Sequence, residues 1–310
     1  MTSRNATSVR AREIEVAVTR APSDWARLLA FGAVQWPWLL KSLYGGPKAD
    51  RAALLARLAL PDEALPHLGS WKADAGLLHR IVDAINTHQP ETIVELGAGA
   101  STLVTARALR MIGGTRRLVS FDQHKDFVTA VRCWLADHDL NADVRYAPLT
   151  AENGLWSGLW YDLYGVPDRI DMLLIDGPPW ALGPTIREGA SCLFSRVPVG
   201  GVVILDDAAR PGERLVARRW REDWPEFDWV FTPGIKGMLK GVRRSNRLDA
   251  RQKNHAGNSP SQAAPYSTQR TLSVPAMGLK ASDKMPKKSG PKPRPIKFCP
   301  KITSDVATAR

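Results

Sequence analysis

Two apolar stretches of the chain end in carboxylates. The first, IDMLLIDGPPW (170–180), places Asp176 before a glycine and two prolines, and the second, GGVVILDDAARPGE (200–213), ends its apolar part at Asp206 and Asp207. If the stretches are neighbouring parallel strands, their carboxyl ends meet at one edge of a sheet, where the carboxylates raise one another's pKa unless a cation lies among them. Asp176, Asp206 and Asp207 are therefore candidate ligands of a hard, oxygen-binding ion such as Mg²⁺. The alternative is that Asp176 contacts a substrate while Asp207 only caps the following turn.

A glycine-rich turn follows another apolar stretch, in ETIVELGAGAS (91–101). Gly97 and Gly99 allow the backbone to pass close to a ligand at positions where a Cβ atom would collide with it. The dinucleotide-binding fingerprint GxGxxG has a third glycine where this chain has Thr102. The carboxylate of Glu95 would also repel a phosphate. A nicotinamide-dependent dehydrogenase is therefore disfavoured, and a cationic ligand near Glu95 is favoured.

Alternating strands and helices would position these residues. The expected strands are 92–96, 117–121, 143–147, 170–175 and 201–206, and the expected helices are 71–88, 101–112, 124–138, 185–197 and 213–222. Continuous apolar strands that alternate with helices indicate a parallel sheet covered on both faces. The last two runs, FDWVF (227–231) and GMLKGVRR (237–244), are joined by a linker too short for a crossover helix, which predicts an antiparallel hairpin. The predicted fold class is α/β, with a doubly wound, mainly parallel seven-stranded Rossmann-like sheet and a C-terminal antiparallel hairpin.

From about Trp71 to Arg244 the chain resembles class I S-adenosylmethionine-dependent methyltransferases. VELGAGAS (94–101) matches their first motif, and FDQH (121–124) matches their ribose-binding acidic position. The resemblance implies S-adenosylmethionine as cofactor, with Glu95 near the amino group of its methionine part and Asp122 accepting hydrogen bonds from the ribose. The full set of implied cofactor-binding residues is Glu95, Gly97, Gly99, Ser101, Asp122, Ala147 (beside the adenine) and Asp176.

The three aspartates are similar to the metal-binding positions of catechol and macrocin-type O-methyltransferases. In those families the carboxylates hold Mg²⁺, which lowers the pKa of the acceptor hydroxyl and aims its oxygen at the methyl group. The resemblance implies O-methylation of a small-molecule or sugar hydroxyl, with Asp176 as the catalytic residue. Those families place a polar catalytic residue shortly after the first aspartate, where this chain has Pro178, Pro179 and Trp180. The alternatives are therefore a metal-independent N-methyltransferase and a catalytically idle, cofactor-binding scaffold protein.

Two further segments carry apolar side chains to the expected site. Aromatic residues of LWSGLWYDLYGVPDRI (155–170) either stack on a sugar or planar substrate or pack on the N-terminal helices; they are Trp156, Trp160, Tyr161 and Tyr164. LLAFGAVQWPWLL (28–40) is too short to span a bilayer and is expected to break at Pro37 into a helix and turn over the core or the substrate cleft. The less favoured alternative is a contact with a membrane surface.

Arg210 and Glu213 are expected to form an ion pair that braces their loop.

The formal net charge of +12 is concentrated at the C-terminal end of the chain. Residues 246–310 contain 13 Lys and Arg against 3 Asp and Glu, together with 8 prolines, which predicts a disordered basic tail over 245–310. The tail is either inert or makes a weak electrostatic contact with nucleic acid or acidic lipid.

The preceding parts are predicted to be a helical extension (1–70) and the methyltransferase domain (71–244). Three widely spaced cysteines fit neither a disulfide framework nor a zinc site, and with no secretory signal evident the expected location is the cytoplasm.

The composition of the tail leads to a truncation experiment. Cutting the chain after Ser245 should leave the melting temperature and the affinity for S-adenosylmethionine nearly unchanged, because the removed residues supply no core contacts. Thermal unfolding and calorimetry of the full and shortened chains measure both quantities. A fall of several degrees in the melting temperature would show instead that the tail packs on the domain.

Overall fold

A computed structural model describes residues 22–65, 68–69, 73–151 and 154–246. The prediction of a disordered tail therefore falls almost entirely outside the described residues, as do the first 21 residues of the predicted helical extension. Within the described part, the extension contains two α-helices, α2 (Pro22–Ser42) and α3 (Lys48–Arg57), and a short 3₁₀ helix, η1 (Asp62–Ala64). None of the helices in the described ranges has the length and apolar character needed to cross a membrane.

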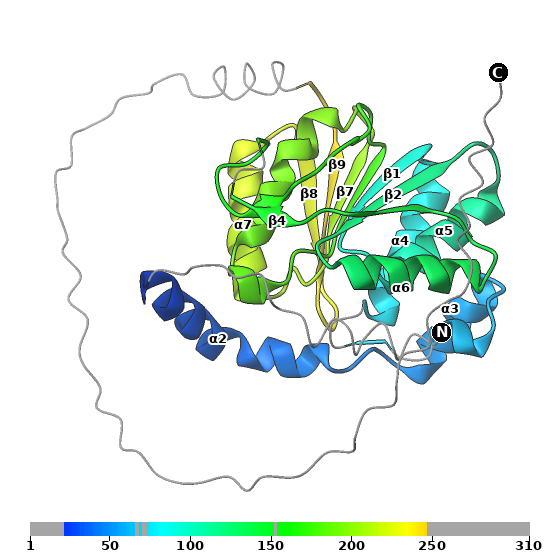
Figure 1. The fold of residues 1–310 in the computed structure, drawn as a ribbon, viewed down its shortest axis with the longest axis horizontal. Helices are drawn as coiled ribbons and strands as arrows, with labels where there is room; N and C mark the ends of the chain where they lie inside the picture. Colours follow the sequence, from blue (N-terminus) through cyan, green and yellow to red (C-terminus); the bar gives the residue numbers. More distant parts are fainter. Residues whose placement is uncertain (1–21, 66–67, 70–72, 152–153, 247–310) are drawn as a thin grey trace, which may run out of the picture. The chain divides into compact units, whose positions relative to one another are not determined.

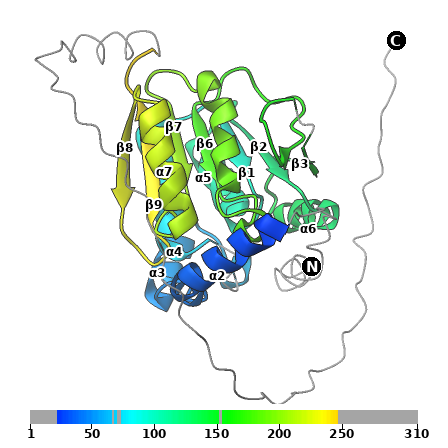
Figure 2. The same cartoon turned by 90° about the vertical axis from the view of Figure 1, so that its left-hand side faces the viewer.

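The centre of the fold is a seven-stranded sheet (Figure 1) with the order β3-β2-β1-β6-β7-β9-β8, in which β3 and β6 are labelled in Figure 2. The first five strands in chain order are parallel to one another, whereas β9 runs antiparallel to both β7 and β8. The strands are β1 (Thr92–Leu96), β2 (Arg117–Asp122), β3 (Asp143–Tyr146), β6 (Met172–Ile175), β7 (Val202–Leu205), β8 (Phe227–Thr232) and β9 (Met238–Arg243). The predicted fold class is confirmed, including the antiparallel hairpin of β8 and β9 at its C-terminal end.

Each face of the sheet is covered by its own group of helices, because successive strand residues point to opposite faces. Ile93 packs with helices α3 to α6, while Val94 packs with η3 and α7 on the other side. The helices are α4 (Ala75–His88), α5 (Ala100–Ile112), α6 (Lys125–Ala136), η3 (Ile186–Arg196) and α7 (Pro211–Asp223). Between β3 and β6 the chain adds a small two-stranded sheet of β4 (Leu149–Thr150) and β5 (Trp160–Tyr161).

Strand register brings the chemically interesting residues together at one edge. Ile175 at the end of β6 is paired with Leu96 of β1 on one side and Leu205 of β7 on the other. The next residue of each strand therefore emerges at the same level. The backbone N–H of Asp176 donates to Leu96 O at 2.8 Å, and that of Asp206 donates to Ile175 O at 3.0 Å. The strand order reverses between β1 and β6, which is where open α/β sheets bind their ligands.

Two helix predictions are corrected by the structure. Helix α2 continues through Pro37 as one element and lies along the carboxyl edge of the sheet (Figure 2). Gly32 of this helix faces the ring of Trp180. A proline removes one backbone donor and bends a helix, but the rest of the ladder can continue on both sides of it. The segment predicted as a helix over 185–197 is a 3₁₀ helix, η3, whose Gly189 is pressed against the ring of Trp160.

The start of α4 also faces this edge. Asp74 is the N-cap of α4, and its Oδ1 accepts a hydrogen bond from Leu77 N at 2.8 Å. Asp74 is buried, so its carboxylate is held in place both by this bond and by its surroundings. This cap is a further carboxylate near the ends of the strands, in addition to the three predicted from the sequence.

Candidate active site

The turn after β1 is built on two glycines with different roles. Gly97 has a φ of +93°, and a Cβ atom there would lie 2.7 Å from Gly177 N in the turn after β6. Gly97 is therefore required by the close approach of another backbone segment of the protein itself, and its predicted contact with a ligand stays a prediction. A Cβ atom on Gly99 would meet no described atom within 4 Å. The space at Gly99 is open, as a ligand-facing position requires.

Glu95 is a fully buried carboxylate with one oxygen unused. Its Oε2 accepts hydrogen bonds from Thr102 Oγ1 and Ser120 Oγ, both at 2.6 Å, whereas Oε1 has no hydrogen-bond partner among the described residues. Burial raises the pKa of Glu95 to about 7, against the lowering effect of the hydroxyl donors. A bound cation would satisfy Oε1 and stabilise the ionised form. Glu95 thus has the chemistry expected of a residue that binds an ammonium group.

Thr102 has a role that the sequence pattern did not indicate. Its hydroxyl donates to Glu95 and accepts from the backbone N–H of Gly99 at 2.8 Å. It therefore links the carboxylate at the end of β1 to the ligand-facing part of the turn. The residue that departs from the dinucleotide fingerprint is a structural part of this site.

The other predicted cofactor-binding residues lie at the neighbouring strand ends. Asp122 ends β2 and is fully buried, and its Oδ1 accepts from His124 N at 2.9 Å. Ala147 follows β3, and its N–H donates to Asp122 O at 2.9 Å. Ser101 is buried in the first turn of α5. The structure thus places these residues and the Glu95 turn along the adjacent ends of β1, β2 and β3. Their individual roles in cofactor binding stay predictions.

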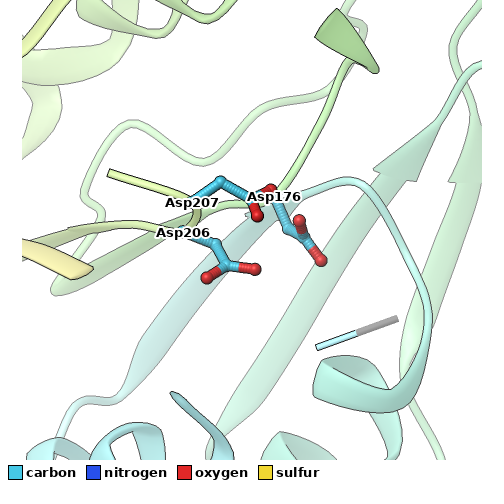
Figure 3. A group of neighbouring side chains, drawn as sticks. All are labelled: Asp176, Asp206 and Asp207. Carbon is cyan, nitrogen blue, oxygen red and sulfur yellow. The ribbon is translucent and has the colours of Figure 1, made fainter. Parts of the chain in front are cut away.

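The three aspartates converge as the sequence predicts. Asp176, Asp206 and Asp207 each offer a carboxylate oxygen within 4.8 Å of the others (Figure 3). Asp206 and Asp207 are buried, while the side chain of Asp176 is 16% exposed. The group therefore has one member open to solvent and two in a low-dielectric environment. Its negative charge requires compensation.

A buried arginine supplies part of that compensation. Arg187 of η3, whose side chain is 4% exposed, lies 3.3 Å from Asp207 and 3.4 Å from Asp176. Its guanidinium also donates to the backbone carbonyls of Pro178, Asp206 and Asp176. These carbonyl contacts fix the guanidinium in the loop itself, independently of the carboxylates. Arg187 is therefore a structural cation of this site.

Two more cations approach Asp207 and Asp206. Arg210 lies 2.7 Å from Asp207 and 2.7 Å from Glu213, so the predicted Arg210–Glu213 ion pair is confirmed. Lys236 lies 3.8 Å from Asp207 and 3.9 Å from Asp206. Burial opposes ionisation of Asp207, but the three cations hold its pKa below the ordinary value. Burial and the neighbouring Asp207 raise the pKa of Asp206 well above the ordinary value, only partly opposed by Lys236.

These contacts bear on the predicted metal ion. Asp207 already has three cationic partners, and Asp176 shares Arg187 with it. A divalent ion among the three carboxylates would lie beside Arg187 and Lys236 with little intervening solvent, and these charges repel it. The residues present therefore do not fit Mg²⁺ well. The metal role of Asp176, Asp206 and Asp207 stays a prediction that the surrounding charges argue against.

The aromatic residues between β3 and β6 divide into two groups. Trp160 and Tyr161 are fully buried; Trp160 packs against Gly189 of η3, and Tyr161 donates to Gln123 Oε1 at 3.0 Å. They belong to the core rather than to a substrate surface, and they pack on η3 and the sheet instead of the N-terminal helices. Tyr164 is 57% exposed and lies under the guanidinium of Arg145.

Two residues of the site, and one buried polar residue of α2, escaped the sequence analysis. Arg187 and Lys236 were placed within an ordinary helix and a hairpin linker, yet both are buried beside the carboxylates. Gln35 of α2 is fully buried, and neither amide atom has a hydrogen-bond partner in the described part of the chain. The available signal was a polar residue inside an apolar stretch, which is clear for Gln35 and weak for the two cations.

Known proteins resemble this chain in structure but not in sequence. No protein-family model matches it, and no curated protein matches its sequence. Among solved structures, a methyltransferase from Podospora anserina bound to S-adenosylhomocysteine is 15% identical, covering 74% of this chain and 99% of its own (TM-score 0.45). The O-methyltransferase TomG from Streptomyces achromogenes, involved in tomaymycin synthesis and solved with S-adenosylmethionine, is 19% identical, covering 70% and 99% (TM-score 0.44). An O-methyltransferase from Bacillus cereus with S-adenosylhomocysteine is 17% identical, covering 70% and 100% (TM-score 0.45).

The raised pKa of Glu95 predicts a pH effect on stability. Between the ordinary value of 4.5 and about 7, the folded chain keeps a proton that the unfolded chain has released, so the free energy of unfolding should fall as the pH rises. The contribution is about 3 kcal/mol, since each pKa unit corresponds to about 1.4 kcal/mol. Glu95→Gln should remove this part of the pH dependence. Urea unfolding of both proteins below and above this window measures the difference.

The exposed Glu91 provides the control, because Glu91→Gln removes a nearby carboxylate that water already solvates. Its pH dependence should match that of the unsubstituted chain. An equal pH dependence in Glu95→Gln would contradict the assignment of a raised pKa to this carboxylate.

Proposed function

We propose that the chain is an S-adenosylmethionine-dependent methyltransferase that acts on a small-molecule acceptor. The observation that carries this proposal is the direct contact of two turns, one after β1 and one after β6, through Gly97 and Gly177. The first turn adjoins Glu95, which suits a cofactor ammonium, and the second follows Asp176. A methyl donor held beside Glu95 and a methyl acceptor held beside Asp176 would meet where the two turns touch.

Two carboxylates would bind different parts of the cofactor. The unused Oε1 of Glu95 would accept hydrogen bonds from the ammonium of the methionine part, and Asp122 would accept them from the ribose hydroxyls. Open space at Gly99 leaves room for the chain that connects them. When bound, S-adenosylmethionine supplies an electrophilic methyl group on a positively charged sulfur.

On the acceptor side, Asp176 is the site carboxylate with solvent access. Its position at the end of β6 places it between the cofactor residues of β1 and the carboxylates of β7. We assign it to the acceptor hydroxyl, whose orientation it would fix and whose proton it would accept as the new carbon–oxygen bond forms. Most of the rate enhancement would come from holding the acceptor in line with the methyl group.

Charge compensation by Arg187, Arg210 and Lys236 favours transfer without a metal ion. That observation also supports a second candidate, a metal-independent N-methyltransferase, since an amine needs no metal to become nucleophilic. Turnover of labelled S-adenosylmethionine with hydroxyl and amine acceptors tests both against a catalytically idle scaffold, which would bind the cofactor and transfer nothing.

Cofactor binding should depend on Asp122. Replacing this buried carboxylate by alanine in Asp122→Ala removes charge-assisted hydrogen bonds worth roughly 1.5–3 kcal/mol, or about ten- to a hundredfold in affinity. Calorimetry with S-adenosylmethionine measures the loss. The exposed Asp126, four residues further on in α6, serves as control, because Asp126→Ala should bind as the unsubstituted chain does. Equal affinity in Asp122→Ala would show that the ribose assignment is wrong.

The charge balance predicts how the protein responds to Arg187→Met and to Mg²⁺. Removing a buried cation leaves Asp176 and Asp207 undercompensated and should lower the free energy of unfolding by about 3–5 kcal/mol. Mg²⁺ should raise the melting temperature of Arg187→Met, because the ion would partly replace the lost charge. In the unsubstituted chain, Mg²⁺ should have no more effect than NaCl of equal ionic strength. A specific Mg²⁺ shift there, or turnover lost in EDTA and restored by Mg²⁺, would favour the metal-assisted mechanism.

A further inference from the structure

A cavity of 240 Å³ lies next to the carboxylate group, on the side away from the cofactor residues. Its walls come from the loop before α3, the start of α4, the end of β7 and the loop between β8 and β9. In the sheet order, β6 separates β1 and β2 from β7 and β9. Asp176, at the end of β6, therefore lies between β7, whose end borders the cavity, and β1, which is followed by the turn of Gly97 and Gly99. We call it the acidic pocket, defined by Pro47, Asp50, Asp74, Arg80, Asp206 and Ile235.

The ionisable lining of the acidic pocket is predominantly negative. Three carboxylates, Asp50, Asp74 and Asp206, line it together with one cation, Arg80. Arg80 is directed to the β8–β9 loop, where its Nη2 donates to Pro233 O at 3.3 Å. Lys236 lies behind Asp206 at 3.9 Å, so three carboxyl groups and two cations lie in or directly behind the lining.

Asp206 is the residue whose surroundings indicate that a ligand binds in this pocket. Its side chain is 2% exposed, and neither carboxylate oxygen has a hydrogen-bond partner among the residues that the structure describes. Lys236 is close enough for an ion pair but too far for a hydrogen bond. A buried carboxylate without donors is costly unless a ligand supplies them. The neighbouring Asp207 (Figure 3) is instead paired through Oδ2 with Arg187 and Arg210.

On the basis of the function proposed above, we propose that the acidic pocket binds a protonated amine of the methyl acceptor, with Asp206 as its main partner and Asp74 as a second carboxylate. An amine supplies the donors that the two oxygens of Asp206 lack. The pocket is several times larger than the roughly 30 Å³ that one water molecule occupies, and the side chains of Pro47, Leu77, Ile235 and Met238 line it as well. These dimensions and apolar walls suit an organic cation with a carbon skeleton rather than a bare metal ion.

The test compares a charged probe with an uncharged one of the same shape. Cyclohexylamine and cyclohexanol are titrated by calorimetry at neutral pH into the full chain saturated with S-adenosylhomocysteine. Cyclohexylamine should bind and cyclohexanol should bind at least about tenfold more weakly, because only the amine forms charge-assisted hydrogen bonds with the carboxylate. Asp206→Asn should reduce cyclohexylamine binding by a similar factor and leave the affinity for S-adenosylhomocysteine unchanged.

Two variants make the result specific to the pocket. Asp74→Asn removes a charge but keeps the cap of α4, because asparagine caps helices as well as aspartate does, so a weaker affinity for cyclohexylamine cannot be attributed to unfolding of the helix. Asp228→Asn removes an exposed carboxylate on β8 that pairs with Arg244, outside the pocket, and should bind as the unsubstituted chain does. Thermal unfolding of each variant confirms that it is folded.

The possible outcomes separate this proposal from the proposed function. Equal binding of cyclohexanol, no binding of cyclohexylamine, or unchanged amine binding in Asp206→Asn would overturn the proposal even if S-adenosylhomocysteine binds. Binding of Mg²⁺ alone that is lost in Asp206→Asn would overturn it in favour of a metal site. If S-adenosylhomocysteine does not bind, the proposed function fails, while the amine titrations on the unliganded chain still decide whether the acidic pocket recognises a cation.

Discussion

The guanidinium of Arg187 is the interaction on which the active-site edge depends. It joins the turn after β6 to the turn after β7 through backbone carbonyls and balances carboxylates from both. Without it, Asp176 and Asp207 would repel each other across a poorly solvated gap, and the two turns would lose a shared partner. Placing a cation there permanently allows the strands to end in carboxylates at the same level. The site can therefore keep its negative groups in place before any substrate arrives.

Much of the fold followed from the sequence because its signals are local. Continuous apolar runs such as 172–175 and 202–205 can be buried only inside a sheet covered on both faces, and the short linker 232–236 allows only a hairpin. The convergence of Asp176, Asp206 and Asp207 followed as well, since Asp176 and Asp206 come directly after their apolar runs and Asp207 is the next residue after Asp206. Strand register then brings these residues to the same level of the sheet, and register in a parallel sheet is constrained by the same apolar pattern.

What the sequence did not show depends on contacts between distant segments. Lys236 looks like an ordinary loop cation, and only the pairing of β9 with β7 brings it next to Asp206. Thr102 was read as a missing glycine because motif matching compares positions, whereas its hydroxyl acts through Glu95, seven residues earlier. Trp160 could not be assigned to core or surface until Gly189 provided the space that accommodates its ring. In each case the deciding partner is far away in the chain and has no fixed spacing.

The contact between Gly97 and Gly177 has a consequence for how this protein can change over evolutionary time. The two turns touch through main-chain atoms, and the Tyr161 hydroxyl lies against Gly177. A methyl group on either glycine therefore has no room. Side-chain substitution therefore cannot adjust the spacing between the turn beside Glu95 and the turn that begins at Asp176. Under the proposed function, descendants of this sequence could acquire new acceptors by altering the pocket walls or helix α2, while the separation of the two turns would be inherited unchanged.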